Sequence, residues 1–164
     1  MTGDERDRCR DAVTAIHQGL RDRGWSLAVG ESLTAGLVAA HLADVPGASD
    51  VLRGGVVAYA TDLKESLLGV PRILLDRTGP VSAEVARAMA EGVANLLGAD
   101  VGLAVTGAAG PTTQGTGEVG EVFGAFVAPG AADVARFRLS GDRNEVRDGA
   151  VVAVLGMLVR ELAD

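Results

Sequence analysis

The sequence predicts an α/β fold: one domain over residues 1–164, with three layers, α/β/α, around a mixed, mostly parallel sheet. Before Gly110, short apolar runs alternate with segments of helical periodicity, which is typical of parallel strands joined by helices. After Gly110, two strand-like runs follow one another directly and predict a hairpin. The composition, 48% apolar with 23 glycines and 3% aromatic residues, indicates a core of small aliphatic side chains.

The first half of the chain predicts helices and strands in alternation, separated by turns rich in glycine and proline. In order, the predicted elements are a surface helix over 4–23 closed by Gly24, a buried strand from Leu27, a helix marked by Leu33, Leu37, Val38 and Leu42, a turn over 44–49, a strand over 54–59, and a short helix over 63–68 capped by Thr61 or Asp62.

The second half predicts one long helix, then strands, then a final helix. In order, these are a helix over 83–97 that begins after Ser82 and stops at Gly98, an apolar strand over 101–105, a glycine-containing loop over 106–111, a polar loop over 112–118 that would suit a substrate-covering flap, strands over 121–128 and 133–139 separated by Pro129 and Gly130, and a helix over 145–162.

Charge and composition exclude several classes of function. The net charge of −7 and the pI near 4.8 oppose binding to DNA or RNA, because such proteins usually present a basic face. Cys9 is the only cysteine, so no intramolecular disulfide can form. His17 and His41 have no second ligand at metal-binding spacing, so we expect no metal. Without a signal-like segment or a membrane-length apolar run, we expect a cytoplasmic protein.

Ser32 is the first candidate for chemistry. It follows an apolar strand and precedes a helical segment, where free backbone N–H groups favour an anion or a developing oxyanion. The alternative is an ordinary helix N-cap, since serine is a preferred capping residue.

Tyr59 and Lys64 form a second candidate pair. Tyr59 ends a predicted strand, and Lys64 falls in the first turn of the next predicted helix. The helix dipole disfavours a cation there, and burial would lower the lysine pKa further, giving the neutral amine that a general base requires. The alternative is a solvated surface lysine.

Two further features could bind an anion. The loop over 106–111 resembles an anion-binding loop but lacks the lysine and the hydroxyl residue of a P-loop. Arg143 lies beside the start of the last predicted helix, where its planar guanidinium could clamp a phosphate or carboxylate. Pairing with Asp142 or Glu145 is an equally good interpretation of its position.

Several motifs, each weak alone, occur in an order that resembles the C-terminal domain of the CinA family, which includes stand-alone nicotinamide-nucleotide amidases. The resemblance extends from about Trp25 to Leu162. The matching pieces are 31–36 (Glu-Ser-Leu-Thr-Ala-Gly), 46–49 (Pro-Gly-Ala-Ser), 53–59 with Lys64, 68–70, 79–82, 104–111 and 140–143. Leu33 and Ala35 stand where the family motif usually has cysteine and glycine.

The resemblance implies a cofactor-free hydrolysis of nicotinamide mononucleotide to nicotinate mononucleotide and ammonia. The family's serine nucleophile falls on Ser32, its lysine base on Lys64 and its assisting tyrosine on Tyr59. The substrate-binding residues that it implies are Glu31, Thr34, Ala35, Gly36, Ser49, Thr106, Gly107, Ala109, Gly110 and Arg143.

Two other functions compete with this one. A catalytically silent nucleotide-binding module could keep the fold, although the joint presence of Ser32, Tyr59 and Lys64 argues against it. An amidase for another small amide is the second rival. The apolar face of the last predicted helix also permits a homodimer.

Overall fold

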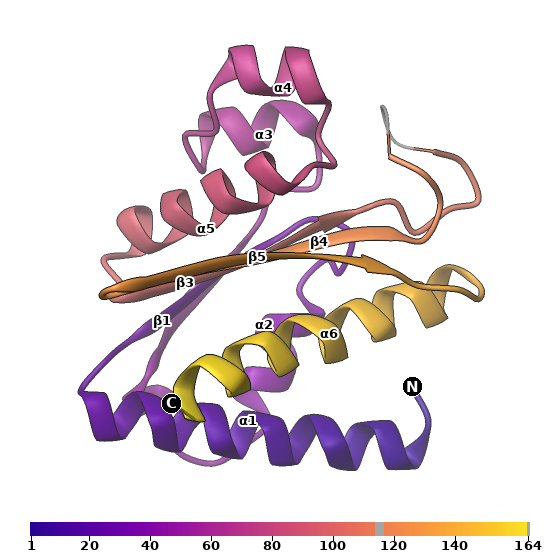
Figure 1. Cartoon of the computed structure of the whole chain (residues 1–164). Coiled ribbons are helices and arrows are strands. Elements are labelled where there is room, and N and C mark those ends of the chain that lie inside the picture. The colour runs from indigo at the N-terminus through magenta and orange to yellow at the C-terminus, as the bar shows by residue number, and fades with distance from the viewer. Residues whose placement is uncertain (114–116, 164) are drawn as a thin grey trace.

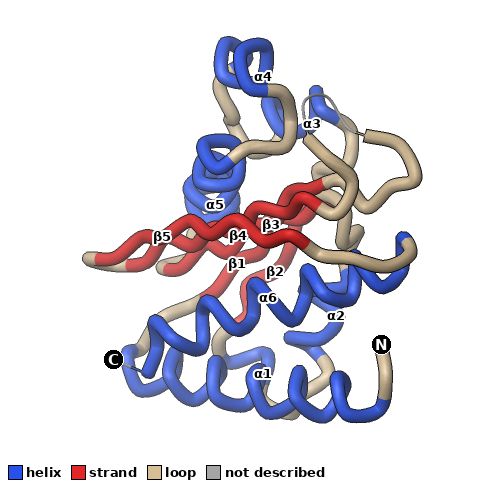
Figure 2. Tube along the Cα trace, turned by 45° about the vertical axis from the view of Figure 1, so that its right-hand side comes forward, coloured by secondary structure: helices blue, strands red, loops and turns tan. Residues whose placement is uncertain are grey.

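The computed structural model describes residues 1–113 and 117–163. The predicted flap over 112–118 therefore falls partly outside the described residues, because 114–116 are not described. Figure 1 shows a central sheet with helices on both faces, and the turned view in Figure 2 gives the same three layers. The predicted α/β/α architecture is confirmed.

The sheet has five strands in the order β2-β1-β3-β4-β5. β1 pairs in parallel with β2 and β3, whereas β3 with β4 and β4 with β5 are antiparallel. Four strands consequently share one direction and β4 is reversed, which gives the mixed, mostly parallel sheet that was predicted. The strands are β1 (Leu27–Glu31), β2 (Leu52–Val57), β3 (Val101–Gly107), β4 (Glu121–Ala128) and β5 (Ala131–Arg138).

Side chains alternate between the two faces of β1 and build two separate cores. Leu27 and Val29 pack against the helices on one face, whereas Ala28 packs against those on the opposite face. The helices on the first face are α1 (Gly3–Arg23), α2 (Leu37–Ala43) and α6 (Arg143–Ala163), and those on the second are α3 (Thr61–Ser66), α4 (Arg72–Thr78) and α5 (Ala83–Leu97). A 3-10 turn, η1 (Ala48–Asp50), precedes β2.

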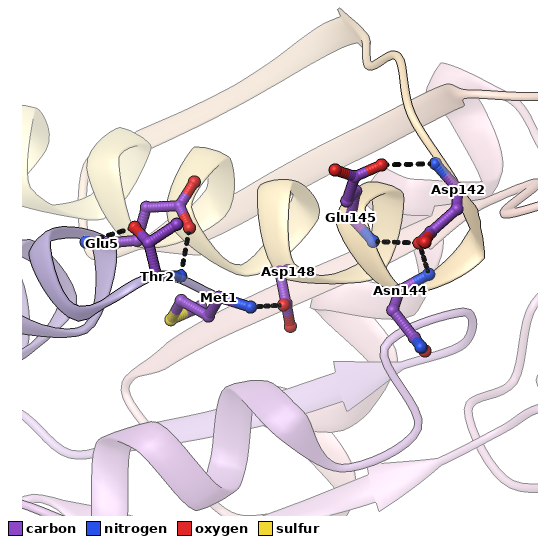
Figure 3. Close-up of polar contacts among 7 residues, drawn as sticks. All are labelled: Met1, Thr2, Glu5, Asp142, Asn144, Glu145 and Asp148. Carbon is purple, nitrogen blue, oxygen red and sulfur yellow. Dashed lines mark hydrogen bonds and ion pairs between the residues drawn. The ribbon is translucent and has the colours of Figure 1, made fainter.

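Side-chain caps define where the two long helices of the first face begin, as Figure 3 shows. At α1, Thr2 and Glu5 exchange hydrogen bonds through a capping box. At α6, the Asp142 carboxylate accepts hydrogen bonds from the backbone N–H groups of Asn144 and Glu145. These caps satisfy N–H groups that a helix end leaves without intrahelical partners.

Several predicted boundaries differ from the structure. The strand predicted over 54–59 is β2, Leu52–Val57, so Tyr59 follows the strand and does not end it, and the strand predicted over 133–139 is β5, Ala131–Arg138. The helices α2, α3 and α6 also begin elsewhere than predicted. α2 begins at Leu37 rather than near Ser32, because residues 33–36 form a turn in which Ala35 and Gly36 take positive φ values of 51° and 98°. α3 begins at Thr61 with Ala60 as its N-cap, so neither Thr61 nor Asp62 caps it. α6 begins two residues before Glu145, at Arg143.

One helix, α4, has no counterpart in the prediction, whereas the bounds of α5 and β4 match it. α5 fits closely against its neighbours because two glycines lie at the contacts. A Cβ on Gly92 would lie 1.8 Å from the Leu68 carbonyl oxygen, and one on Gly102 would lie 2.0 Å from that of Ala90. The first contact lets the segment that follows α3 pack directly against α5.

None of the helices in the described part of the chain is both long enough and apolar enough to cross a membrane.

Candidate functional site

A buried serine and a buried lysine meet at the carboxyl end of the parallel strands. Ser32 follows β1 directly and is 7% exposed, and Lys64 on α3 is 1% exposed. Lys64 Nζ donates hydrogen bonds to Ser32 Oγ at 3.0 Å and to the Ala58 carbonyl oxygen at 2.9 Å. The nucleophile candidate and the base candidate are therefore in direct contact.

Burial lowers the pKa of the Lys64 ammonium from 10.5 to about 8. No carboxylate within the described residues forms an ion pair with Lys64, so no opposite charge offsets this desolvation. Lys64 is also the fourth residue of a six-residue helix and lies in its last turn. The low pKa thus arises from burial, and the predicted contribution of the helix dipole is not its cause. A surface lysine, the alternative interpretation, is wrong.

Ser32 is not a helix cap. The N-cap of α2 is Gly36, and its backbone conformation, not a side chain, begins the helix. The Ser32 N–H donates to the Val105 carbonyl on β3 at 3.0 Å, which anchors the start of the turn to the sheet. The hydroxyl is left facing Lys64, which is the arrangement that nucleophilic chemistry requires.

Glu31 supplies the cap that the turn itself lacks. Its carboxylate, 1% exposed, accepts hydrogen bonds from the Thr34 hydroxyl at 2.6 Å and from the Gly36 N–H at 2.9 Å. The N–H groups of Val38 and Ala39 complete the set, at 3.2 and 2.9 Å. A carboxylate thus already accepts the free N–H groups at the N-terminus of α2. Substrate binding by Glu31 stays a prediction.

Arg143 joins two residues of the predicted site. One guanidinium nitrogen donates to the Tyr59 hydroxyl and another to the Gly110 carbonyl oxygen, both at 2.6 Å. Asp142 and Glu145 cap α6 instead, and Arg143 forms no ion pair with any described residue. The interpretation that Arg143 only pairs with these neighbouring acids is therefore wrong.

These contacts enclose a small pocket of about 30 Å³ above Ser32. This is far below the roughly 300 to 1,000 Å³ of typical ligand pockets, so a ligand of ordinary size requires Arg143 or a neighbouring loop to move. Arg143 is its only charged lining residue among those described. The lining consists of Ser32, Leu33, Tyr59, Gly107, Ala109, Gly110, Thr112 and Arg143.

The other predicted site residues lie in three different environments. Thr34, Ala35 and Gly36 continue the turn after Ser32, and the buried Thr106 hydroxyl donates to the Pro80 carbonyl at 2.8 Å. Ser49, in contrast, is exposed in η1, before the start of β2, and so lies at the opposite end of the parallel strands from Ser32. A strand of this length separates the two by roughly 16 Å. The structure does not bring Ser49 into the site.

The sequence-based reasoning missed Arg147. This residue lies one helical turn after Arg143 on α6, and its guanidinium donates to the carbonyl oxygens of Leu33 and Thr34 at 2.9 and 3.1 Å. Its spacing from Arg143 was visible, but nothing local indicated contact with a turn more than 110 residues earlier. In the described part of the chain, no three His, Cys, Asp or Glu side chains gather to hold a metal.

The fold and the site define a three-layer α/β domain that presents a buried Ser-Lys pair at the carboxyl edge of its parallel strands. A family model, the CinA C-terminal domain, matches residues 10–162. This chain therefore belongs to the CinA C-terminal domain family, as its motifs predicted.

Relatives and solved structures agree with this assignment. CinA-like proteins from Frankia casuarinae and Geobacter sulfurreducens are 46% and 43% identical over 93% and 91% of this chain. The matches cover 36% of each relative, so the chain spans about a third of the length of the curated relatives it matches.

Two crystal structures are similar over nearly their whole length. A competence-damaged protein (CinA) superfamily protein from Klebsiella pneumoniae has a TM-score of 0.90 and 30% identity, covering 94% of this chain and 98% of that one. The competence/damage inducible protein CihA from Agrobacterium tumefaciens has a TM-score of 0.88 and 32% identity, covering 100% and 98%.

Proposed function

We propose that this domain is a serine amidohydrolase that hydrolyses the carboxamide of nicotinamide mononucleotide to nicotinate mononucleotide and ammonia. The observation that carries the proposal is the 3.0 Å hydrogen bond between Lys64 Nζ and Ser32 Oγ, together with the burial that lowers the lysine pKa to about 8. A lysine of that pKa is partly neutral near pH 7 and can accept the serine proton. The choice of nucleotide rests on the family resemblance.

In the proposed reaction, Ser32 Oγ attacks the carboxamide carbon as Lys64 Nζ takes the hydroxyl proton. Lys64 then returns that proton to the departing nitrogen, the C–N bond breaks, and ammonia leaves an acyl ester on Ser32. Water attacks this ester with Lys64 again as base, which releases the carboxylate and restores the serine. Tyr59, which also lines the pocket, orients or relays the proton in this scheme.

The tetrahedral intermediate needs donors for its negative oxygen. The backbone N–H groups of Leu33 and Thr34 donate no hydrogen bond to any described residue and are next to the nucleophile. They are the donors that we assign to the oxyanion. Thr34 and Leu33 also present their carbonyl groups to Arg147, which keeps those oxygens turned away from the site.

The charges around Ser32 favour an anionic substrate. Arg143 lines the pocket and forms no ion pair with a described residue, although the whole chain carries a net charge of −7. A phosphate that displaces the Tyr59 hydroxyl and the Gly110 carbonyl from Arg143 would gain a bidentate, charge-assisted contact. The loop over 106–110 would then hold the ribose.

The proposal includes a cytoplasmic location and permits a homodimer.

The test is the release of ammonia from purified protein supplied with nicotinamide mononucleotide, free nicotinamide or NAD. We expect ammonia from the mononucleotide in wild type and none above background from Ser32→Ala. Ammonia from a different amide alone would support the rival amidase. Tight binding of the mononucleotide without any hydrolysis would support the silent nucleotide-binding module.

A further inference from the structure

Two charged side chains of opposite sign hold the turn that follows Ser32. The Glu31 carboxylate accepts four hydrogen bonds from residues 34–39, and the Arg147 guanidinium donates to the carbonyl oxygens of Leu33 and Thr34. Neither Glu31 nor Arg147 forms an ion pair within the residues described. Both charges therefore act on the backbone of this turn and on the start of α2.

The orientation of one peptide group follows from the Arg147 contact. The bond between Leu33 and Thr34 is trans, so its N–H points in the opposite direction from its carbonyl. The carbonyl oxygen lies 2.9 Å from Arg147 Nε on α6, while Lys64 is on α3 at the other face of the sheet (Figure 1). The Thr34 N–H consequently points away from α6, and it donates to no described residue.

We infer that Arg147 is a positioning residue that turns the Thr34 N–H toward the oxygen of the reacting amide and strengthens it as a donor. The inference rests on the proposed function, because it takes Ser32 as the nucleophile. A guanidinium bound to a peptide carbonyl polarises that peptide and makes its N–H a better donor. Its positive charge also favours the oxyanion of the transition state over the neutral carboxamide group of the bound substrate. Arg147 acts through the backbone and touches no reacting atom.

A purely structural role for Arg147 predicts different consequences. If the residue only fastened α6 to the turn, its loss would lower stability and alter substrate binding without a specific effect on the chemical step. If it orients an oxyanion donor, its loss lowers kcat while KM stays nearly constant, because the ground-state amide is neutral.

The variants for the test are Arg147→Gln, which keeps one donor but no charge, and Arg147→Lys, which keeps the charge without the planar fork. Arg160→Gln, an exposed position on the same helix, is the matched control. With nicotinamide mononucleotide, we expect Arg147→Gln to lower kcat about 100-fold with KM within about threefold of wild type. The kcat of Arg147→Lys should lie between those of Arg147→Gln and wild type. The kcat and KM of Arg160→Gln should match those of wild type.

The midpoint of the pH–rate profile should stay near pH 8 in Arg147→Gln, because Lys64 is unchanged. Circular dichroism checks that each variant is folded, and Arg147→Lys keeps the test decisive where Arg147→Gln does not fold. A folded Arg147→Gln with a kcat within about threefold of wild type overturns the inference. An equal loss of kcat in Arg160→Gln overturns it as well.

A fluorophosphonate probe separates this inference from the proposed substrate. Ser32 Oγ forms a P–O bond as fluoride leaves and Lys64 takes the proton, and the phosphoryl oxygen then occupies the place of the oxyanion. Labelling of Ser32 without hydrolysis of the mononucleotide overturns the choice of substrate. In that case, slower labelling of Arg147→Gln than of wild type still supports the positioning role. Equal labelling rates overturn that role. A wild-type protein that shows neither labelling nor ammonia release overturns both proposals.

Discussion

Lys64 Nζ lies 3.0 Å from Ser32 Oγ, and both side chains are buried although 32 residues separate them. The contact follows from the positions of two neighbouring strands. Ser32 comes directly after β1, and the segment after β2 leads into the short helix that carries Lys64. β1 and β2 are parallel neighbours, so their carboxyl ends place both residues at one edge.

Ser32→Ala should abolish turnover and leave the fold intact. The proposed nucleophile is lost, so we expect kcat to fall by about 10⁴-fold or more, with the mononucleotide affinity largely unchanged. Stability should change by less than about 1 kcal/mol, because only one hydroxyl is removed and Lys64 keeps its bond to Ala58. Ammonia release and calorimetric titration measure the two effects. Near-normal turnover in a folded variant would refute the assignment.

The pH dependence of kcat/KM should report the titration of Lys64. Burial lowers its pKa to about 8, and the base must be neutral, so the rate should fall as pH drops below 8. Lys64→Arg should be nearly as inactive as Lys64→Met, since a guanidinium keeps the charge but stays protonated. Substantial activity in Lys64→Arg would mean that positive charge alone is required, and the mechanism would be withdrawn.

Lys64→Met should also stabilise the domain near neutral pH. The folded-state pKa is lower than the unfolded value of 10.5, so the unfolded state binds more protons and stability rises with pH between about 8 and 10.5 in wild type. Removing the amine should eliminate that slope and add on the order of 1 kcal/mol at pH 7, after the loss of two hydrogen bonds. Urea unfolding at pH 7 and pH 9.5 tests this. An unchanged pH slope would argue that Lys64 is not desolvated.

Arg143→Lys separates phosphate clamping from other roles of this side chain. A lysine keeps the charge but loses the fork that now bridges Tyr59 and Gly110. We expect KM for nicotinamide mononucleotide to rise about tenfold, with little change for the riboside, which lacks the phosphate. Equal losses on both substrates would indicate that Arg143 serves the structure around the first turn of α6.

The stability of the domain should depend on His17, which lies in the core on the α1 face. Its side chain is fully buried, and neither ring nitrogen has a hydrogen-bond partner within the described part of the chain. Burial lowers its pKa from 6.5, and the charge of Arg21 acts in the same direction. A contact with the Leu42 backbone that falls short of hydrogen-bond geometry and the charge of Asp50 oppose this shift. The unfolded state therefore binds more protons, so His17 makes stability fall as pH drops below 6.5.

His17→Leu tests this titration. It should flatten the fall in stability below pH 6.5 and raise stability at pH 7 by about 1 kcal/mol, because it removes two unpaired polar atoms. His41→Leu, a partly exposed position on α2, is the control. Equal pH slopes in wild type and His17→Leu would contradict the prediction.

Local patterns predicted most of the elements, because helix and strand periods can be read from a few neighbouring residues. α5 is an example: Ser82, the apolar stripe and Gly98 lie within one stretch, and the helix has the predicted bounds. The hairpin of β4 and β5 followed from its central Pro-Gly pair. The short α4 was missed because its seven residues bury only one side chain, Leu75, and so show no apolar periodicity.

The ordered motifs also identified residues that lie together in the structure, namely Ser32, Tyr59, Lys64 and Arg143. Tertiary structure alone decided how they meet. Arg143 contacts Tyr59 from 84 residues away, and Arg147 contacts Leu33 from 114 residues away. Ser49 also lies in one of the ordered motifs, but the fold places it at the opposite end of the parallel strands from Ser32. Distances of this kind depend on strand order and on which face each helix covers, and no local periodicity encodes either.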